Sequence, residues 1–123
     1  MAFLDASPLS KGHTLVVPKQ HHATLLDIPI PELTYLMSKI QSIATSILTV
    51  LDVTDFNLLQ NNGPSAAQVV NHLHFHIIPR PAGSLSWLSN ESVKRVHIST
   101  TCQDELCLKI KEAYYKYQEK PVN

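Results

Sequence analysis

Three histidines, His72, His74 and His76, alternate with apolar residues. Strict alternation has the period of a β-strand, so the pattern predicts that the three imidazoles share one face while the residues between them enter a core. Neighbouring histidines on such a face lie about 6–7 Å apart. A packed face without chemistry explains this regularity poorly, so residues 72–78 predict a catalytic or ligand-binding face on a rigid element.

Metal binding is one chemistry that imidazoles at this spacing support. Two histidines at positions i and i+2 of a strand can share one zinc ion. The third ligand would come from elsewhere in the chain, and His13, His21 and His22 are the candidates. No cysteine, aspartate or glutamate lies within three residues of the histidine segment. The metal interpretation also leaves the third in-line histidine without a role.

Phosphoryl chemistry without a metal is the second possibility, and we favour it. A neutral imidazole can attack phosphorus and form a phosphohistidine-type intermediate. Neighbouring imidazoles and amides can donate hydrogen bonds to the phosphoryl oxygens. The preceding segment supplies such donors at Asn61, at Gln68 and in the backbone around Gly63. His74 has a histidine on each side, which makes it the natural nucleophile.

The hydrophobic pattern indicates the strands that must position these side chains. Residues 13–17 predict a buried strand that stops at proline, and residues 55–60 predict another strand. A strong turn at residues 61–65 then leads towards the histidine segment, which suggests an antiparallel pair joined by a functional loop. Residues 1–5 are consistent with the end of a further strand.

Two helices complete the expected α+β domain. Apolar residues recur with helical spacing through residues 33–51, and Glu32 suits the first turn of that helix. A second apolar stripe runs through residues 106–117. Residues 99–101 supply helix-cap chemistry, and Gln103 would complete a capping box.

The composition fits one globular domain. The chain has 123 residues, 44% of them hydrophobic, with 10 acidic and 10 basic side chains, so charge gives no sign of a nucleic-acid or membrane partner. Cys102 and Cys107 form neither a CxxC pair nor a disulfide framework, which favours a reducing compartment. No signal peptide or membrane span is visible. We therefore expect a cytoplasmic protein that can also enter the nucleus.

The histidine segment resembles the signature of the histidine triad (HIT) family, His-φ-His-φ-His-φ-φ, in which φ is an apolar residue. Further matching stretches are residues 3–5 with 12–21, residues 59–63 with 68–70, and residues 79–80. Together they run from residue 3 to residue 80, about two thirds of the chain. The resemblance is to the Hint-like branch in its fungal form, whose members are adenosine 5′-monophosphoramidases that split P–N bonds in AMP conjugates.

The resemblance implies a HIT-like α+β fold, with an antiparallel sheet, one long helix and a C-terminal helix, in a single domain over residues 1–123. Members of the family usually carry a further strand and hairpin before this point, often with a CxxC pair that can bind structural zinc. We expect that this N-terminal piece is missing here and that the structural zinc site does not form.

The resemblance also assigns catalytic roles by motif position. His74 would attack the α-phosphorus and become adenylylated. His76 would hydrogen-bond the phosphate or the leaving group. His72 and His13 would orient and tune the other two. No cofactor or metal is implied for this chemistry.

By the same resemblance, a purine nucleotide such as AMP is the expected ligand. Asn61 and Gln68 would hold phosphate and ribose-side oxygens, and Asp5 would accept hydrogen bonds from the ribose hydroxyls. The adenine pocket would be lined by Phe3, Ala6 and Leu15, each of which could also be ordinary core. His21 and His22 are expected to be surface residues of a loop.

Two residues depart from the family pattern. Ala67 stands where a glycine is common, and Val69 stands where a serine or threonine often contacts the phosphate. Because valine removes a hydrogen-bond donor, transition-state stabilisation of about 2–4 kcal/mol is at stake.

The resemblance further implies a homodimer whose sheet continues across the interface, with Trp87 as a candidate to lie near the partner's site. Three alternatives to a phosphoramidase remain. They are a nucleotide-binding regulatory protein with weak or no catalysis, a dinucleoside polyphosphate hydrolase, and an aprataxin-like DNA-deadenylating enzyme. The third predicts a basic patch and a zinc finger, and residues 81–123 contain neither. Direct nucleic-acid binding is therefore not expected.

Overall fold

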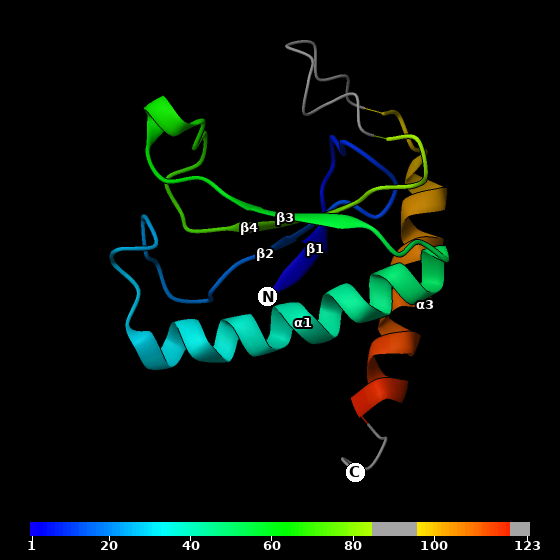
Figure 1. Cartoon of the computed structure of the whole chain (residues 1–123), viewed down its shortest axis with the longest axis horizontal. Helices are drawn as coiled ribbons and strands as arrows, with labels where there is room; N and C mark the ends of the chain where they lie inside the picture. Colours follow the sequence, from blue (N-terminus) through cyan, green and yellow to red (C-terminus); the bar gives the residue numbers. More distant parts are fainter. Residues whose placement is uncertain (85–95, 119–123) are drawn as a thin grey trace.

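In the described part of the chain, a four-stranded antiparallel sheet packs with two helices, α1 and α3 (Figure 1). The structure is a computed structural model that describes residues 1–84 and 96–118. The strands lie in the order β1-β2-β4-β3, and each is antiparallel to its neighbour. The elements are β1 (Ala2–Leu4), β2 (Thr14–Val16), α1 (Ile30–Leu51), β3 (Phe56–Gln60), the 3-10 turn η1 (Pro64–Ala66), β4 (Phe75–Pro79) and α3 (Thr100–Gln118). The α+β fold expected from the sequence is confirmed.

The long helix α1 lies along one face of the sheet (Figure 1). It follows Pro29 at the N-cap, has Pro31 in its first turn and Glu32 near its positive end, and stops at Asp52, whose backbone is left-handed. Its buried side chains include Leu36, Ile40 and Ile47, which join residues of β2 and β4 in the core. Each such side chain contributes about 1.5–3 kcal/mol when it leaves water. No helix in the described part of the chain is long and apolar enough to cross a bilayer.

Alternation along the strands separates this core face from an open face. In β4, Phe75 and Ile77 are buried in the core against α1, whereas His76 points to the opposite face. The strand register places Leu15 of β2 on one side of His76 and Leu59 of β3 on the other. The histidine face is therefore backed by a rigid, close-packed layer.

The predicted histidine strand is wrong for residues 72–74, because β4 begins only at Phe75. The backbone N–H of Leu73 donates to the carbonyl of His22 at 2.7 Å, outside the sheet ladder. His72 and His74 thus lie on the loop that enters the strand, and only His76 sits within β4. The side chains of residues 72–77 still alternate in burial. The backbone N–H of Leu73, however, bonds to the loop that carries His22 and not to a neighbouring strand.

The capping box predicted at the start of α3 is also wrong. Ser99 supplies the cap, since its hydroxyl accepts from the backbone N–H of Cys102 at 3.2 Å. The Gln103 side chain instead donates from Nε2 to the backbone carbonyl of Asp5 at 3.1 Å. Farther along α3, Leu106 is buried and Ile110 packs against the core. Trp87 lies outside the described residues, as does the side chain of Tyr117.

Candidate active site

Backbone groups select the tautomer of the buried histidine His13. The N–H of Leu9 donates to Nδ1 of His13 at 3.0 Å, so this nitrogen carries a lone pair and the ring proton sits on Nε2. Nε2 lies 2.9 Å from Nδ1 of His76. His13 therefore donates to His76, and the proton of the neutral His76 ring resides on its own Nε2. Nothing in the sequence pattern indicated a role for the Leu9 backbone.

The tautomer of His74 is the opposite one. Its Nδ1 lies 2.7 Å from the carbonyl oxygen of His72, and a carbonyl only accepts, so Nδ1 carries the proton. Nε2 of His74 then holds a lone pair. The His74 and His76 rings stand edge to face with centroids 5.0 Å apart. The neighbouring rings thus offer an unprotonated Nε2 on His74 and an Nε2–H donor on His76.

His72 belongs to a second pair of imidazoles. Its Nε2 donates to the carbonyl of Pro18 at 3.0 Å, which leaves Nδ1 to accept from Nδ1 of His21 at 3.3 Å. His21 is exposed, as expected for a surface loop. His22 is not a simple surface residue, because its side chain is largely buried and pairs with Glu32 at 2.9 Å. The loop that carries His21 therefore fixes the start of the histidine segment.

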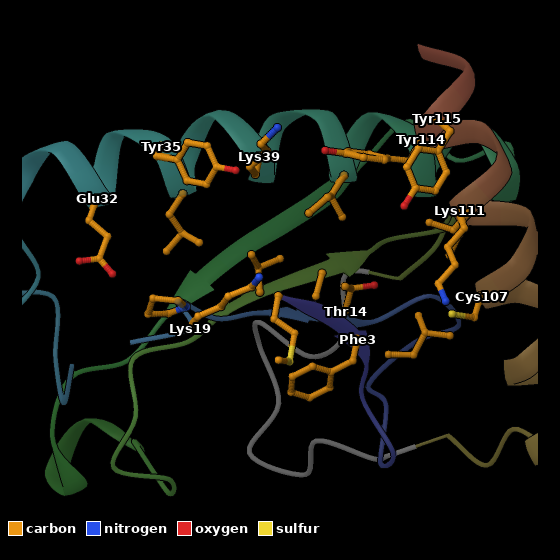
Figure 2. A pocket seen from close by; sticks show the side chains of 18 of the residues that line it. Phe3, Thr14, Lys19, Glu32, Tyr35, Lys39, Cys107, Lys111, Tyr114 and Tyr115 are labelled. Carbon is orange, nitrogen blue, oxygen red and sulfur yellow. The ribbon is translucent and has the colours of Figure 1, made fainter. Parts of the chain in front are cut away.

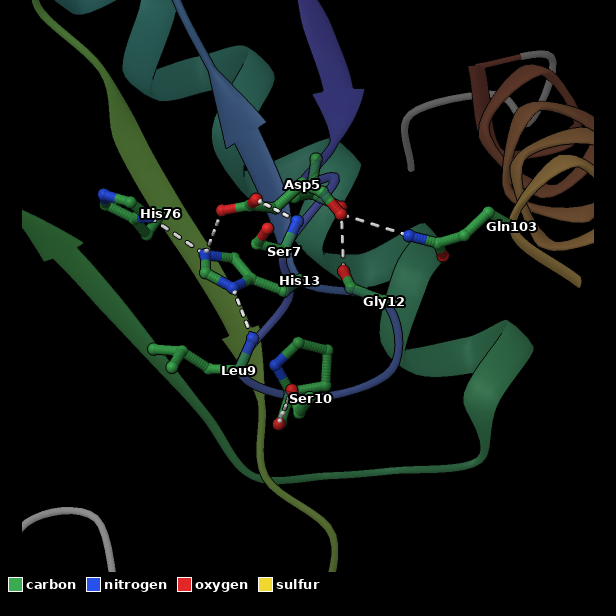
Figure 3. A network of polar contacts seen from close by, with 10 residues as sticks. Asp5, Ser7, Leu9, Ser10, Gly12, His13, His76 and Gln103 are labelled. Carbon is green, nitrogen blue, oxygen red and sulfur yellow. Dashed lines mark hydrogen bonds and ion pairs between the residues drawn. The ribbon is translucent and has the colours of Figure 1, made fainter. Parts of the chain in front are cut away.

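Asp5 lies at the other end of the histidine cluster (Figure 3). Its backbone N–H extends the β1–β2 ladder by donating to the carbonyl of His13 at 2.9 Å. Its carboxylate accepts from the backbone N–H of Ser7 at 2.8 Å and lies 3.6 Å from Nε2 of His13. Residues far apart in sequence thus place one carboxylate beside two imidazoles.

Asp5, His13 and His76 offer ligand atoms that all lie within 4.8 Å of one another, which would suit a metal ion. Protonation argues against this use. A histidine that ligates a metal through one nitrogen donates its proton from the other. Nδ1 of His13 instead accepts from Leu9 N–H, so ligation through Nε2 would break that hydrogen bond. The hydrogen bonds of His13 therefore favour a proton, and not a metal ion, between its Nε2 and Nδ1 of His76.

Of the residues predicted to line an adenine pocket, two lie on the same face as the histidines. Phe3 pairs with Leu15 across the β1–β2 ladder, and Leu15 pairs with His76. Phe3 is exposed and Leu15 is partly buried, so the two form an apolar shelf beside the imidazoles. Ala6 is exposed in the loop that follows Asp5.

The loop before the histidines holds Gln68 through its side-chain amide. Its Oε1 accepts from the backbone N–H of Gly63 at 2.7 Å, and its Nε2 donates to the carbonyls of Ala23 and Val70 at 2.6 and 3.1 Å. Both amide protons are thus used within the protein. Asn61 is half-buried at the end of β3. In this conformation Gln68 shapes the loop, and its predicted contact with phosphate stays a prediction.

The two departures from the family pattern lie in the same loop. Ala67 has φ +67°, a left-handed conformation that glycine adopts without strain. Val69 is 92% exposed, so its isopropyl group faces solvent. The backbone conformation at residue 67 therefore favours glycine. The valine side chain at residue 69 makes no packing contact with the described part of the chain that would explain its presence there.

A cavity of about 960 Å³ opens between the helices and the first strands, and Phe3 is among the residues that line it (Figure 2). It is bounded by α1, α3 and the first two strands, with Tyr35 and Lys39 on α1 and Lys111 and Tyr114 on α3. None of His13, His72, His74 and His76 lines it. The histidines lie instead on β4, on the loop that enters it and beside the start of β2, and we take this histidine cluster as the candidate active site.

The chain belongs to the histidine triad family, because the model described as HIT domain matches residues 1–83. The solved structure of a hypothetical histidine triad nucleotide-binding protein from Sulfolobus tokodaii is similar in fold, with a TM-score of 0.84 and 32% sequence identity. That match covers 97% of this chain and 80% of the other. The fold thus agrees with the family.

Two curated relatives carry names that state an activity. Adenylylsulfatase HINT3 of Arabidopsis thaliana is 42% identical over 95 residues, which covers 77% of this chain. Adenosine 5′-monophosphoramidase HNT1 of Saccharomyces cerevisiae is 46% identical over 79 residues, which covers 64% of this chain. In both cases the match spans only 48% of the relative's own length.

Proposed function

We propose that this protein is a nucleotide hydrolase that splits the P–N bond of AMP conjugates through a nucleotidyl-histidine intermediate. The observation that carries the proposal is the tautomer of His74, whose Nδ1 donates to the His72 carbonyl and whose Nε2 holds a lone pair. Relatives named as a phosphoramidase and an adenylylsulfatase support an adenylyl group as the one transferred.

The first step forms the bond between Nε2 of His74 and the α-phosphorus as the P–N bond breaks. Nε2–H of His76, whose Nδ1 accepts from His13, donates a hydrogen bond to the phosphate or the leaving group, and the leaving amine takes its proton from solvent. In the second step water attacks phosphorus and releases a proton to solvent, the N–P bond to His74 breaks, and AMP leaves.

The adenosine would occupy the apolar shelf and the Asp5 loop. Phe3 and Leu15 lie in one row with His76 across the sheet, so a base on this shelf brings the phosphate towards the histidines. The carboxylate of Asp5 would accept from the ribose hydroxyls, with Ala6 beside it. Asn61 would contact the phosphate or ribose from the other side.

Mass spectrometry of protein quenched during turnover of AMP–lysine tests this proposal directly. We expect an AMP adduct on His74 and a loss of turnover on the order of 10³-fold or more in His74→Ala, with AMP binding largely retained. His97→Ala is the matched control, since it removes an exposed histidine outside the cluster. Equal rates for His74→Ala and the wild type would refute the nucleophile assignment.

A regulatory nucleotide-binding protein with weak or no catalysis is the second candidate. It is favoured by two features of the loop before the histidines: the engaged amide of Gln68 and the valine at residue 69. A wild-type chain that binds AMP without turnover of AMP–lysine, adenylyl sulfate or a dinucleoside polyphosphate would support it. Cleavage of the dinucleoside polyphosphate alone would instead identify a polyphosphate hydrolase.

We also propose a homodimer joined at the free edge of β3. Among the described residues β3 pairs only with β4, so its outer backbone groups face outwards. Phe56 and Leu58 point to the same face as α1, yet both remain 42% exposed. An uncovered apolar edge strand is a template for a second strand, and a second copy supplies an identical one.

A further inference from the structure

The loop that carries Asp5 is fastened to the C-terminal part of the chain (Figure 3). Nε2 of Gln103 donates to the Asp5 carbonyl at 3.1 Å, and the backbone N–H of Val96 donates to the Pro8 carbonyl at 2.9 Å. The HIT-domain match ends at residue 83, so both donors lie beyond it. Two hydrogen bonds thus link a segment outside the matched domain to the candidate active site.

The helix α3 holds Gln103 in a fixed position. Leu106 and Ile110 lie on the same helical face, three and seven residues farther on, and both pack into the protein. The orientation of the Gln103 amide is also fixed, because a flipped amide would bring its oxygen against the Asp5 carbonyl. Oε1 of Gln103 is buried without a hydrogen-bond partner among the described residues. Only its donor function is used.

The loop that these hydrogen bonds hold positions the Asp5 carboxylate and determines the tautomer of His13. The Asp5 carbonyl belongs to the peptide plane that follows the Asp5 side chain, so fixing it constrains the carboxylate and Ala6 together. Farther along the same loop, the Leu9 N–H selects the tautomer of His13. Gly12 closes the loop at φ +87°, where a Cβ would lie 2.6 Å from Leu51.

We propose that Gln103 is a positioning residue for nucleotide binding, which acts through Asp5 by holding the loop of residues 5–12 against α3. The proposal rests on the proposed function for its ligand, the ribose of an adenine nucleotide. It goes beyond that function by assigning part of the ribose selectivity to a helix outside the HIT-domain match.

Gln103→Met tests the proposal, because methionine keeps the length of the side chain and removes the donor. We expect AMP to bind about fivefold more weakly, as for the loss of one net hydrogen bond, and 2′,3′-dideoxy-AMP to bind as in the wild type. In Asp5→Asn the same Gln103→Met change should have no further effect on AMP binding. Gln103→Glu, with an acceptor in place of the donor, should act in the same direction.

Gln41→Met is the matched control, since Gln41 is an exposed residue of α1. Thermal unfolding of Gln103→Met should match the wild type, because the substitution also removes the unpartnered Oε1. Equal weakening of AMP and dideoxy-AMP binding would indicate general loss of structure and overturn the proposal. Unchanged binding of both nucleotides would overturn it as well.

Amide exchange in the absence of nucleotide separates this proposal from the proposed function. In Gln103→Met, the N–H groups of Ser7 and Leu9 should exchange faster, because they bond to Asp5 and His13. A wild type that fails to bind AMP would refute the nucleotide function while this loop measurement still decides the role of Gln103. Unchanged exchange at both amides would refute the positioning role.

Discussion

Individual hydrogen bonds decide which nitrogen of each histidine can react. His74 is protonated at Nδ1 because it faces the His72 carbonyl, whereas His13 is protonated at Nε2 because it accepts from Leu9. His76 accepts from His13 at Nδ1, and His72 donates to the Pro18 carbonyl from Nε2. Both rings are therefore protonated at Nε2. His74, the proposed nucleophile, thus has the opposite tautomer from its three neighbours.

This arrangement predicts the nitrogen shifts of the histidine rings. Long-range ¹H–¹⁵N spectra at neutral pH should show an Nδ1–H ring for His74 and Nε2–H rings for His13, His72 and His76. In His13→Phe, His76 loses its donor, so its ring should become a mixture of tautomers while His74 is unchanged. An Nε2–H ring at His74 in the wild type would leave no lone pair on Nε2, the nitrogen proposed to attack phosphorus, and would contradict the mechanism.

A single side chain in the loop before the histidines is expected to limit catalysis. Val69→Thr keeps the shape of the side chain and restores a hydroxyl where the family often has a phosphate contact. We expect kcat/KM for AMP–lysine to rise by about 30-fold or more, which starts at the lower end of the range for one transition-state hydrogen bond. Val69→Ala is the control and should not raise the rate. Equal rates for both variants would show that this position does not reach the phosphate.

At the scale of elements, the loop of residues 61–74 carries strain that a substitution can relieve. Ala67 has φ +67°, which costs a non-glycine residue about 1 kcal/mol, so Ala67→Gly should stabilise the fold by about 0.5–1 kcal/mol. Urea denaturation measures the difference. Ala66→Gly is the control, because Ala66 lies in the turn η1 at ordinary φ and glycine there should destabilise the protein.

Elements whose structure depends on local pattern were predicted correctly from the sequence. The apolar spacing of α1 and the prolines at its start are sufficient because neighbouring turns of one helix make the relevant contacts. The burial of Phe75 and Ile77 in the core followed from alternation in the same way.

Features that depend on distant partners were not predicted. Gln103 fits a capping box by local rules, yet its donor goes to Asp5, 98 residues away in sequence. The strand predicted over residues 72–74 does not form for the same reason, since the backbone N–H of Leu73 bonds to the carbonyl of His22 in another loop. The Leu9 N–H that sets His13 could not be identified, because every non-proline residue has such a group.

At the scale of the whole molecule, the exposed edge of the sheet predicts the assembly. Leu58→Lys places a charge on the α1-side face of β3, where Leu58 is 42% exposed, and it should convert the proposed homodimer into a monomer. Light scattering after size exclusion measures the mass. Leu25→Lys is the matched control, since Leu25 is an exposed leucine in the loop before α1 and should leave the dimer intact.

The folded monomer should survive this change, because the core of Val16, Ile47 and Ile77 lies between the sheet and α1 and does not include Leu58. Far-UV circular dichroism of Leu58→Lys should therefore match the wild type while the mass halves. If turnover of AMP–lysine falls together with the mass, the partner subunit completes the site, and if turnover is retained, each chain acts alone. A wild-type chain that is monomeric at micromolar concentration would contradict the assembly at β3, because an uncovered apolar edge would then remain exposed without a partner.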